Sequence, residues 1–330
     1  MNVSRKSLLA LSGLVMILAA TSAQLPPAVD LQASIPFRFV TLGDTRFHDP
    51  SDTGHANPVI RQALVSAITD ERPAFICITG DIVYRGDDTK DWLVWDSETA
   101  AWREHKIPIY PALGNHDLKG DEKAALANYF HRFPEIAGNR FYALHAANSL
   151  ILVLDSSLDE LSGAQGSWIA AQLDHLSTDV DFVFLVFHHP PYTSSSDQNV
   201  TGGHSARSTE QALGRMLEER QPYTRARFIV FSGHVHNYEH QEHNGVIYLV
   251  TGGGGAPPYR FTRTPDDLYR DPGVNYHYLL IEVKSSFLKI TMHKAEIGSS
   301  LPVWTVADIV SVTVPIPGSR AKKPGSPVSR

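Results

Sequence analysis

Five short apolar segments of this chain share one feature that constrains the fold more than any other. Each segment ends in residues whose side chains can bind a metal ion. In chain order the endings are Gly43-Asp44, Gly80-Asp81 with Tyr84, GNHD (114–117), FHHPPY (187–192) and SGHVHNYEH (232–240). Ligands of open α/β sheets collect at the carboxyl ends of the strands, so these endings can converge although they lie far apart in the chain.

The rest of the pattern also predicts an α/β protein. Apolar segments alternate with amphipathic stretches along the body of the chain. Several apolar segments have no polar face, which is typical of central strands covered on both sides. We expect strands at 37–43, 74–79, 107–113, 182–188, 227–233 and 246–252, hairpins at 141–155 and 275–295, and helices at 57–71, 89–104, 121–132, 165–176 and 206–220.

Composition limits the class of protein. The 330 residues are 42% hydrophobic and 19% charged, which suits one large or two medium globular domains and excludes a disordered chain. The formal net charge is −6, and no basic block in the body suggests a nucleic-acid footprint. Cys77 is the only cysteine, so an intrachain disulfide is excluded, and we expect it to be a small core residue.

The donor types at the five endings indicate the kind of metal site. Carboxylates, an asparagine carbonyl, a phenol and imidazoles supply oxygen and nitrogen without any thiolate, which suits Zn, Fe or Mn but not a structural zinc finger. With one bridging carboxylate, two cations about 3.5–4 Å apart can clamp the attacking and leaving oxygens of a displacement at phosphorus. Each ending alone also occurs as an ordinary turn, but their joint occurrence at successive strand ends favours a two-metal hydrolase.

The motifs GD, GDxxY, GNHD, HxP and GHxH occur in this order, and from about residue 36 to about residue 295 the chain resembles the metallophosphoesterase (calcineurin-like phosphoesterase) superfamily, in particular its purple acid phosphatase branch. The resemblance implies a four-layer αββα sandwich of two mixed β-sheets flanked by helices. It also implies an acid phosphatase-like hydrolase of small phosphomonoesters, in which metal-activated hydroxide attacks phosphorus. The implied cofactors are two metal ions, Fe with Fe, Zn or Mn.

The resemblance assigns a role to each candidate residue. The first metal would be held by Asp44, Asp81, Tyr84 and His236, and the second by Asp81 as a bridge, Asn115, His188 and His234. His116 would contact the substrate and protonate the leaving alkoxide, and Asp117 would orient its ring. The HxP pattern selects His188 as the ligand and leaves His189 to face the substrate or to support the ligands.

Position 46 departs from the family pattern. Many superfamily members have histidine there and purple acid phosphatases usually have glycine, whereas this chain has Arg46. A guanidinium is costly beside metal ions but can bind phosphate bidentately, so we hypothesise a phosphate clamp. The alternative is an ion pair with Asp49 or Asp52.

The missing histidine at position 46 also affects Tyr84. Without it, Tyr84 is left to complete the ligands of the first metal, and a phenolate ligand favours trivalent iron. The alternative is that Tyr84 packs beneath its loop.

The ends of the chain suggest export. Residues 1–23 combine Arg5 and Lys6, an apolar run and small residues at 21 and 23, which predicts a cleaved signal peptide, or alternatively an uncleaved anchor. No second segment is long and apolar enough to span a bilayer, so we expect a periplasmic or secreted protein without stable membrane insertion. The remaining predicted regions are a linker (24–35), the catalytic domain (36–314) and a disordered basic tail (315–330).

Other functions stay open at this level. The same ligand pattern serves phosphodiesterases and nucleotidases, and a metal-binding or phosphate-binding protein could keep it without catalysis. A base-stacking aromatic such as Trp92, Trp95 or Tyr192 would favour a nucleotide. The loops at 194–206 and 253–273 are long enough to shape specificity, and His48, His55 and His204 lie in loops that can overhang the site. The sequence does not determine the metals, the physiological substrate, the pH optimum or the oligomeric state.

Overall fold

The computed structural model describes residues 26–158, 161, 163–196, 204–298 and 301–314. The predicted signal peptide (1–23) and basic tail (315–330) lie outside these residues. Among the helices that are described, none combines the length and apolar character needed to cross a membrane.

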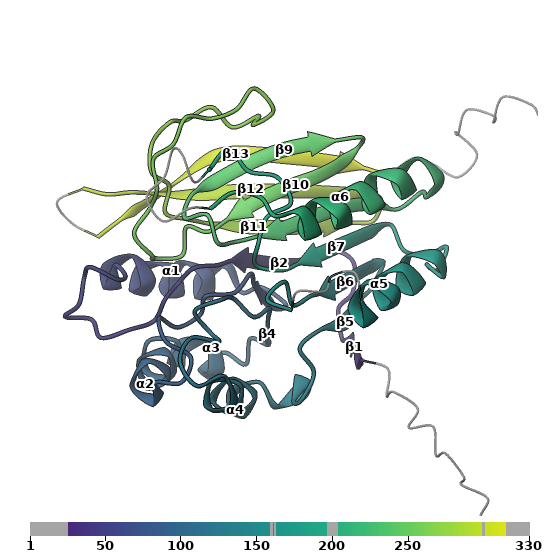
Figure 1. Ribbon diagram of the computed structural model, residues 1–330. Helices are drawn as coiled ribbons and strands as arrows, with labels where there is room; N and C mark the ends of the chain where they lie inside the picture. Colours follow the sequence, from purple (N-terminus) through teal and green to yellow (C-terminus); the bar gives the residue numbers. More distant parts are fainter. Residues whose placement is uncertain (1–25, 159–160, 162, 197–203, 299–300, 315–330) are drawn as a thin grey trace, which may run out of the picture.

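Two mixed β-sheets pack face to face in the middle of the molecule (Figure 1). The seven-stranded sheet has the order β1 (Ala28–Leu31), β5 (Tyr142–Ala146), β6 (Ser149–Val153), β7 (Phe182–Val186), β8 (Arg227–Ser232), β10 (Val246–Thr251) and β9 (Tyr238–His243). The six-stranded sheet has the order β13 (Val303–Thr313), β12 (Phe287–Glu296), β11 (His277–Lys284), β2 (Phe37–Leu42), β3 (Ile76–Ile78) and β4 (Ile109–Pro111).

Helices cover both outer faces, so the predicted four-layer α/β sandwich is confirmed (Figure 1). They are α1 (Pro58–Glu71), α2 (Thr89–Glu98), α3 (Ala100–Glu104), α4 (Glu122–Arg132), α5 (Ala164–Asp174) and α6 (Ser208–Arg220), with single 3-10 turns η1 (Pro134–Ile136) and η2 (Gln221–Tyr223). Asn57 is the N-cap of α1, because its side chain accepts the N–H groups of Val59 and Ile60, in agreement with the helix expected at 57–71. The single helix expected at 89–104 divides at Thr99.

The all-apolar strands are covered on both faces, as their sequence predicts. In β7, Val183 and Leu185 belong to the apolar cluster formed with α5 and α6. Phe184 points to the opposite side and meets Phe39 of β2 at a ring-centroid distance of 5.1 Å, which closes the core between the sheets. Cys77 is fully buried in β3, in agreement with its expected role in the core.

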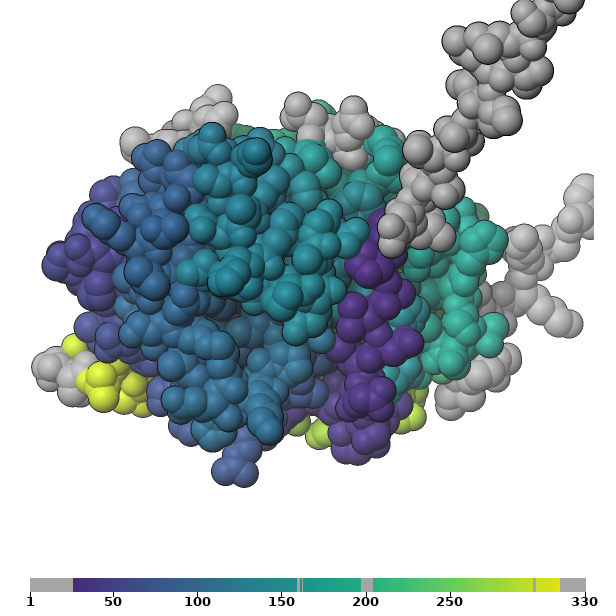
Figure 2. Space-filling model, turned by 90° about the horizontal axis from the view of Figure 1, so that it is seen from below, coloured from purple at the N-terminus to yellow at the C-terminus, as the bar shows by residue number. Residues whose placement is uncertain are grey.

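Three edge strands escaped prediction. β1 lies in the region expected to be a linker, and it pairs in parallel with β5 from Ala28↔Ala143 to Leu31↔Ala146. In Figure 2 this purple segment lies beside blue and teal residues from the middle of the chain. β9 and β13 are also edge strands, and their many polar or exposed residues give no burial pattern. An edge strand forms because a neighbouring strand offers it hydrogen bonds, so its own sequence predicts the strand only weakly.

Candidate metal centre

Five loops bring the predicted ligands to one point between the two sheets. Three of them follow the parallel neighbours β2, β3 and β4, and two follow the parallel neighbours β7 and β8. Backbone hydrogen bonds join the loops: the Asp44 N–H donates to the Gly80 carbonyl at 3.0 Å, and the Gly233 N–H donates to the His188 carbonyl at 2.9 Å. Parallel strands end at the same edge of a sheet, and this explains the convergence.

The backbone at this point is strained. Asp44 (φ 57°), Arg46 (φ 46°), Asp81 (φ 55°) and His234 (φ 68°) all adopt left-handed conformations. Such conformations cost on the order of 1–3 kcal/mol each and concentrate at functional sites. Gly80 also has a positive φ of 95°, and a Cβ there would lie 2.8 Å from His188 Nδ1, so this turn requires glycine.

Asp44, Asp81 and His236 form the first group of donors, and all three are buried. His236 Nε2 lies 3.4 Å from Asp44 Oδ1, and neither atom has a hydrogen-bond partner among the described residues. The other ring nitrogen of His236, Nδ1, donates to the Pro257 carbonyl at 2.8 Å, so Nε2 directs its lone pair into the group. Unpartnered buried acceptors are costly, and a cation between them removes that cost.

The second group consists of Asp81, Asn115, His188 and His234. His188 Nε2 lies 3.3 Å from Asp81 Oδ1, 3.0 Å from Asn115 Oδ1 and 3.2 Å from His234 Nδ1. These separations suit tetrahedral zinc, whose ligand atoms lie about 3.3 Å apart when the bonds are about 2.0–2.1 Å. His188 Nδ1 donates to the Thr79 carbonyl, so its Nε2 lone pair faces two oxygen acceptors. The donor set therefore fits a second metal ion, with Asp81 shared between the groups.

The Arg46 side chain points into the metal centre and does not form the surface ion pair with Asp49 or Asp52 that was considered from sequence. Its Nη2 and Nε donate to Asp81 Oδ2 at 3.1 and 3.3 Å, and its side chain is 12% exposed. Asp49 instead accepts hydrogen bonds from Ser51, and Asp52 pairs with His48 and His55. The alternative considered from sequence, an ion pair of Arg46 with Asp49 or Asp52, is therefore wrong, because the guanidinium pairs with Asp81.

The electrostatics favour the protonation states that a metal requires. Burial lowers the pKa of His236 to about 3, which keeps the imidazole neutral. Burial would raise the pKa of Asp81, but the Arg46 guanidinium and the hydrogen bond from the backbone N–H of His116 act in the opposite direction; this pKa is lowered, and Asp81 stays ionised. Burial raises the pKa of Asp44 to about 7, and the Asp81 charge acts in the same direction. A cation beside Asp44 would reverse this shift.

His116 lies beside the second group, with its ring oriented by the backbone. The backbone N–H of His116 donates to Asp81 Oδ1 at 2.8 Å, and its ring Nδ1 donates to the Tyr84 carbonyl at 2.7 Å. Burial lowers the pKa of His116 to about 4. The carbonyl of Tyr84, rather than Asp117, therefore holds this ring, and the expectation that Asp117 orients it is wrong.

Asp117 has a different contact set. Its Oδ1 accepts the N–H groups of Ile82 and Val83 at 2.8 and 3.2 Å, and its Oδ2 accepts the Gly114 N–H at 2.9 Å. The carboxylate is fully buried below the loops. Asp117 thus joins the loop after β3 to the loop after β4, which positions Asp81 and Asn115 relative to each other.

His189 lies against the second group from the other side. Its ring centroid is 4.4 Å from that of His234, and its donor atom lies within 4.8 Å of those of His188 and His234. Its Nδ1 contacts Ser156 Oγ at 2.9 Å, and the same hydroxyl accepts the His189 N–H. The side chain is therefore fixed at the site, where it can support the ligands or meet the substrate.

Tyr84 packs on the side of the site where His116 lies. Its ring centroid lies 4.1 Å from that of His55, 4.9 Å from that of His48 and 5.2 Å from that of His116. The Lys119 ammonium lies 4.2 Å from the centre of the Tyr84 ring. Among the described residues, the ring contacts of Tyr84 do not include His236 of the first group, and the role of Tyr84 as a metal ligand stays a prediction.

Two residues at the centre were not singled out as ligands or substrate contacts from sequence. The Tyr259 ring stacks on His236 at 4.3 Å, with an angle of 12° between the planes. Its hydroxyl meets His204 Nε2 at 3.1 Å, and the His204 ring stacks on His234 at 4.3 Å. Both come from the long loops considered above, but no motif or spacing identifies them, because only the tertiary structure brings these loops over the ligands.

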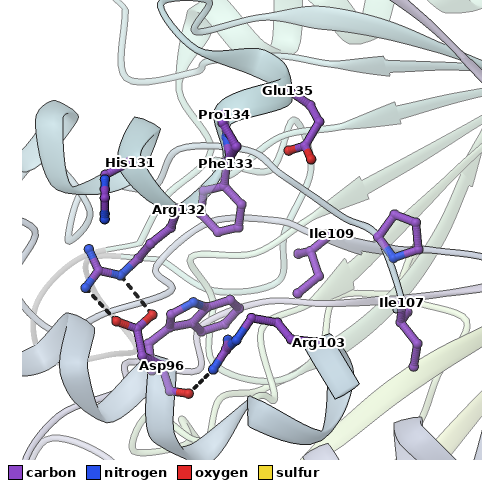
Figure 3. A pocket seen from close by; sticks show the side chains of 11 residues that line it. Asp96, Arg103, Ile107, Ile109, His131, Arg132, Phe133, Pro134 and Glu135 are labelled. Carbon is purple, nitrogen blue, oxygen red and sulfur yellow. Dashed lines mark hydrogen bonds and ion pairs between the residues drawn. The ribbon is translucent and has the colours of Figure 1, made fainter. Parts of the chain in front are cut away.

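A pocket of about 420 Å³ lies elsewhere, between α2, α3 and the segment from α4 to η1 (Figure 3). Its lining includes Asp96, Arg103 and Arg132. The Arg132 guanidinium donates to both oxygens of Asp96 at 3.0 and 2.8 Å, and Arg103 donates to the Asp96 carbonyl. The pocket contains none of the predicted ligands and its main charges are already paired, so it is not the metal centre.

Comparisons with known proteins agree with the site. The model of the calcineurin-like phosphoesterase family matches residues 37–238. Purple acid phosphatase 23 of Arabidopsis thaliana is 25% identical over 217 residues, which cover 61% of this chain and 44% of the relative. Purple acid phosphatase 5 of the same plant is 23% identical over 240 residues, which cover 70% of this chain and 51% of the relative. The chain thus spans about half the length of these curated relatives.

Solved structures show the same fold. Purple acid phosphatase PPD1 from yellow lupin seeds matches with a TM-score of 0.66 at 20% identity, over 86% of this chain and 54% of the lupin chain. A dimetal phosphatase from Danio rerio matches with a TM-score of 0.54 at 13% identity, over 84% of this chain and 99% of the other. Because the family model covers more than half of the sequence and its motifs meet at one donor cluster, the chain belongs to the calcineurin-like phosphoesterase family of metal-dependent phosphoric ester hydrolases.

Proposed function

We propose that this protein is an exported phosphatase that hydrolyses small phosphomonoesters at a binuclear metal centre, in the manner of a purple acid phosphatase. One observation carries the proposal: two groups of converging donors, the first of them fully buried, share Asp81. The first metal would be held by Asp44, Asp81, His236 and the predicted ligand Tyr84, and the second by Asp81, Asn115, His188 and His234. When bound, the metals supply Lewis-acid activation of water and neutralise charge on the phosphoryl group.

His116 is the proposed proton donor to the leaving oxygen. The Tyr84 carbonyl holds its Nδ1, so Nε2 is the ring nitrogen left for the substrate. Burial lowers the pKa of His116 to about 4, so its imidazolium is a stronger acid than an ordinary histidine. A bound phosphate would raise the protonated fraction of His116. This favours work at acid pH.

Arg46 is the proposed phosphate clamp. Its guanidinium already lies at Asp81 Oδ2, beside the position where two metals would share this carboxylate. A guanidinium at this position can donate two hydrogen bonds to a phosphate held at the centre. His189 is proposed to contact the substrate from the opposite side.

The three aromatic residues considered from sequence as partners for a base do not support the nucleotide alternative. Trp92 and Trp95 are buried in the core, and Trp92 Nε1 donates to the Gly86 carbonyl. The Tyr192 hydroxyl donates to Glu218 of α6. None of these three side chains is therefore placed to stack on a base at the metal centre.

The decisive experiment combines metal analysis with substrate comparison. The purified mature protein should contain two metals per chain and should hydrolyse p-nitrophenyl phosphate faster than bis(p-nitrophenyl) phosphate between pH 4 and pH 8. His116→Gln should lower kcat by about 10²- to 10⁴-fold while both metals remain bound. His131→Gln, at an exposed position on α4, serves as the control. Preference for the diester would contradict the substrate class, and absence of turnover with both metals bound would favour a binding protein.

Two finer elements of the proposal have their own tests. If Tyr84 is a ligand of trivalent iron, iron-loaded protein absorbs visible light by phenolate-to-iron charge transfer, and Tyr84→Phe abolishes the band. A band that persists in Tyr84→Phe would point to another phenol, and Tyr259 is the one that stacks on His236.

Export predicts that the protein recovered outside the cytoplasm begins after Ala23, which N-terminal sequencing would verify.

A further inference from the structure

A second group of donors lies outside the metal centre, in the loop between β2 and α1. We propose that His48, Asp52 and His55, here called the loop triad, bind a further divalent cation of the zinc class. The three donor atoms lie within 4.8 Å of one another. His48 Nε2 is 3.3 Å and His55 Nδ1 is 2.8 Å from the same oxygen, Asp52 Oδ2.

A contact with Asp91 fixes the orientation of the His48 ring. Its Nδ1 lies 2.6 Å from Oδ1 of Asp91, a buried carboxylate at the start of α2. This carboxylate accepts the Nδ1 hydrogen, so in the neutral ring Nε2 carries a lone pair directed at Asp52 Oδ2. Two lone pairs that face each other at this distance need a cation between them, either a second ring proton or a metal ion. A carboxylate behind a histidine is also the usual support of a zinc ligand.

The Asp52 carboxylate is oriented as well. Its Oδ1 accepts the N–H of Gly54 at 3.2 Å in a local turn, which leaves Oδ2 for the two histidines. The spacing His-x3-Asp-x2-His places all three ligands in one short loop. The carbonyl of His48 accepts a hydrogen bond at 3.0 Å from Arg61, a buried side chain of α1, so the loop is anchored at its first ligand.

The surroundings of the loop triad suit a site with an open coordination position. The Tyr84 ring covers both imidazoles, at 4.9 Å from His48 and 4.1 Å from His55. On the other side the site is open, because the side chains of His48, Asp52 and His55 are 20%, 39% and 44% exposed. Two imidazoles and one carboxylate with room for water match the ligand set of zinc sites that keep an exchangeable position.

The loop triad is separate from the metal centre but adjacent to it. The Tyr84 ring also contacts His116, at 5.2 Å between ring centroids. A cation in the loop triad would therefore add positive charge one aromatic ring away from the proposed proton donor. An anionic group on the leaving part of a substrate would be attracted to this charge and to the exchangeable position.

The test is a count of bound zinc on the full mature chain. Equilibrium dialysis with zinc, followed by elemental analysis, should give one more ion per chain for the wild type than for Asp52→Asn. Asp49→Asn is the matched control, because Asp49 lies in the same loop and accepts its hydrogen bonds from Ser51. Asp91→Asn should retain the site with about 10- to 100-fold weaker affinity, since it removes only the support of His48.

A second measurement keeps the proposal testable if Asp52→Asn folds poorly. Cobalt should give a visible spectrum with one component that is absent from His55→Gln and present in Asp49→Asn. Equal zinc content in the wild type and in both Asp52→Asn and His55→Gln would overturn the proposal. So would an NMR result showing His48 still doubly protonated in excess zinc. Either outcome leaves the two-metal phosphatase untouched, because none of its proposed ligands belongs to the loop triad.

Discussion

At the scale of single residues, the contact between Arg46 and Asp81 is where the proposed phosphate clamp can be tested. Arg46→Gln removes the charge but keeps most of the length of the side chain. We expect kcat/KM for a monoester and the affinity for inhibitory phosphate to fall about 10- to 100-fold, the value of one or two hydrogen bonds to a charged group. Steady-state kinetics with phosphate as a competitive inhibitor measure both quantities.

The control for this substitution is Arg85→Gln. Arg85 is half exposed and pairs with Asp87 in the loop after β3. If phosphate inhibition is unchanged in Arg46→Gln, the guanidinium serves only to neutralise Asp81, and metal affinity is then the quantity that changes.

His277 makes the stability depend on pH. It is fully buried at the start of β11, and burial lowers its pKa to about 4 from an ordinary value near 6.5. Between these pH values the unfolded chain binds a proton that the folded chain does not, so stability falls as the pH falls from about 6.5 to about 4. The loss from this residue is about 3 kcal/mol at most.

Urea unfolding of metal-free protein at pH 7 and pH 4.5 measures this effect. His277→Gln cannot titrate and should show a smaller loss of unfolding free energy between the two pH values than the wild type. The exposed His175→Gln should behave like the wild type. An equal loss in His277→Gln and the wild type would assign the pH dependence to the histidines of the metal centre instead.

At the scale of elements, one buried ion pair joins α1, α2 and the loop after β2. Arg61 donates to Glu98 at 3.0 and 2.8 Å, and the two side chains are 1% and 8% exposed. The same guanidinium donates to the carbonyls of Arg46 and His48. The packing of the two helices therefore sets the position of a loop that serves both the metal centre and the loop triad.

Breaking this pair should be costly. Arg61→Met leaves the Glu98 carboxylate buried without a partner, and we expect a loss of about 3–5 kcal/mol in the free energy of unfolding. Arg61→Met combined with Glu98→Met should recover part of that loss. Arg38→Met, in the more exposed pair with Glu71, should cost about 1 kcal/mol or less. A small effect of Arg61→Met in urea unfolding would show that water reaches Glu98.

At the scale of the whole molecule, the metal centre should act as a clamp between the two sheets. Asp44, Asp81 and Asn115 come from the six-stranded sheet, whereas His188, His234 and His236 come from the seven-stranded sheet. A metal that binds only the folded chain stabilises it by about 2.7 kcal/mol at a free concentration of 100 times Kd. For a domain of this size we expect a rise in Tm of about 5 °C.

Calorimetry before and after chelation measures this contribution. Chelator should lower Tm of the wild type, and added metal should restore it. His236→Gln should reduce the response, while Asp49→Asn should retain it. An unchanged Tm after complete metal removal would mean that the sheets are held by their apolar core alone.

The element pattern was largely predictable because its causes are local. Apolar runs such as Phe182–Val186 have few alternatives to a buried central strand, and Asn57 before Pro58 marks a helix start by its own chemistry. The edge strands β1, β9 and β13 were missed because their hydrogen-bond partners, and not their own side chains, define them. The short break at Thr99 was missed because both halves of that segment have helical composition.

By itself the sequence determined the α/β class, the motif order that identifies the family, and the metal-ligating chemistry of the strand endings, since residue type and spacing fix these. The tertiary structure decided which of those residues meet and in which geometry. Asp117 binds backbone amides, Arg46 pairs with Asp81, and His204 and Tyr259 stack on the predicted ligands His234 and His236. These contacts join segments that are distant in the chain, or they depend on a left-handed backbone. A local sequence pattern predicts neither kind of contact. The distances between the loops of two packed sheets are set by the core between the sheets.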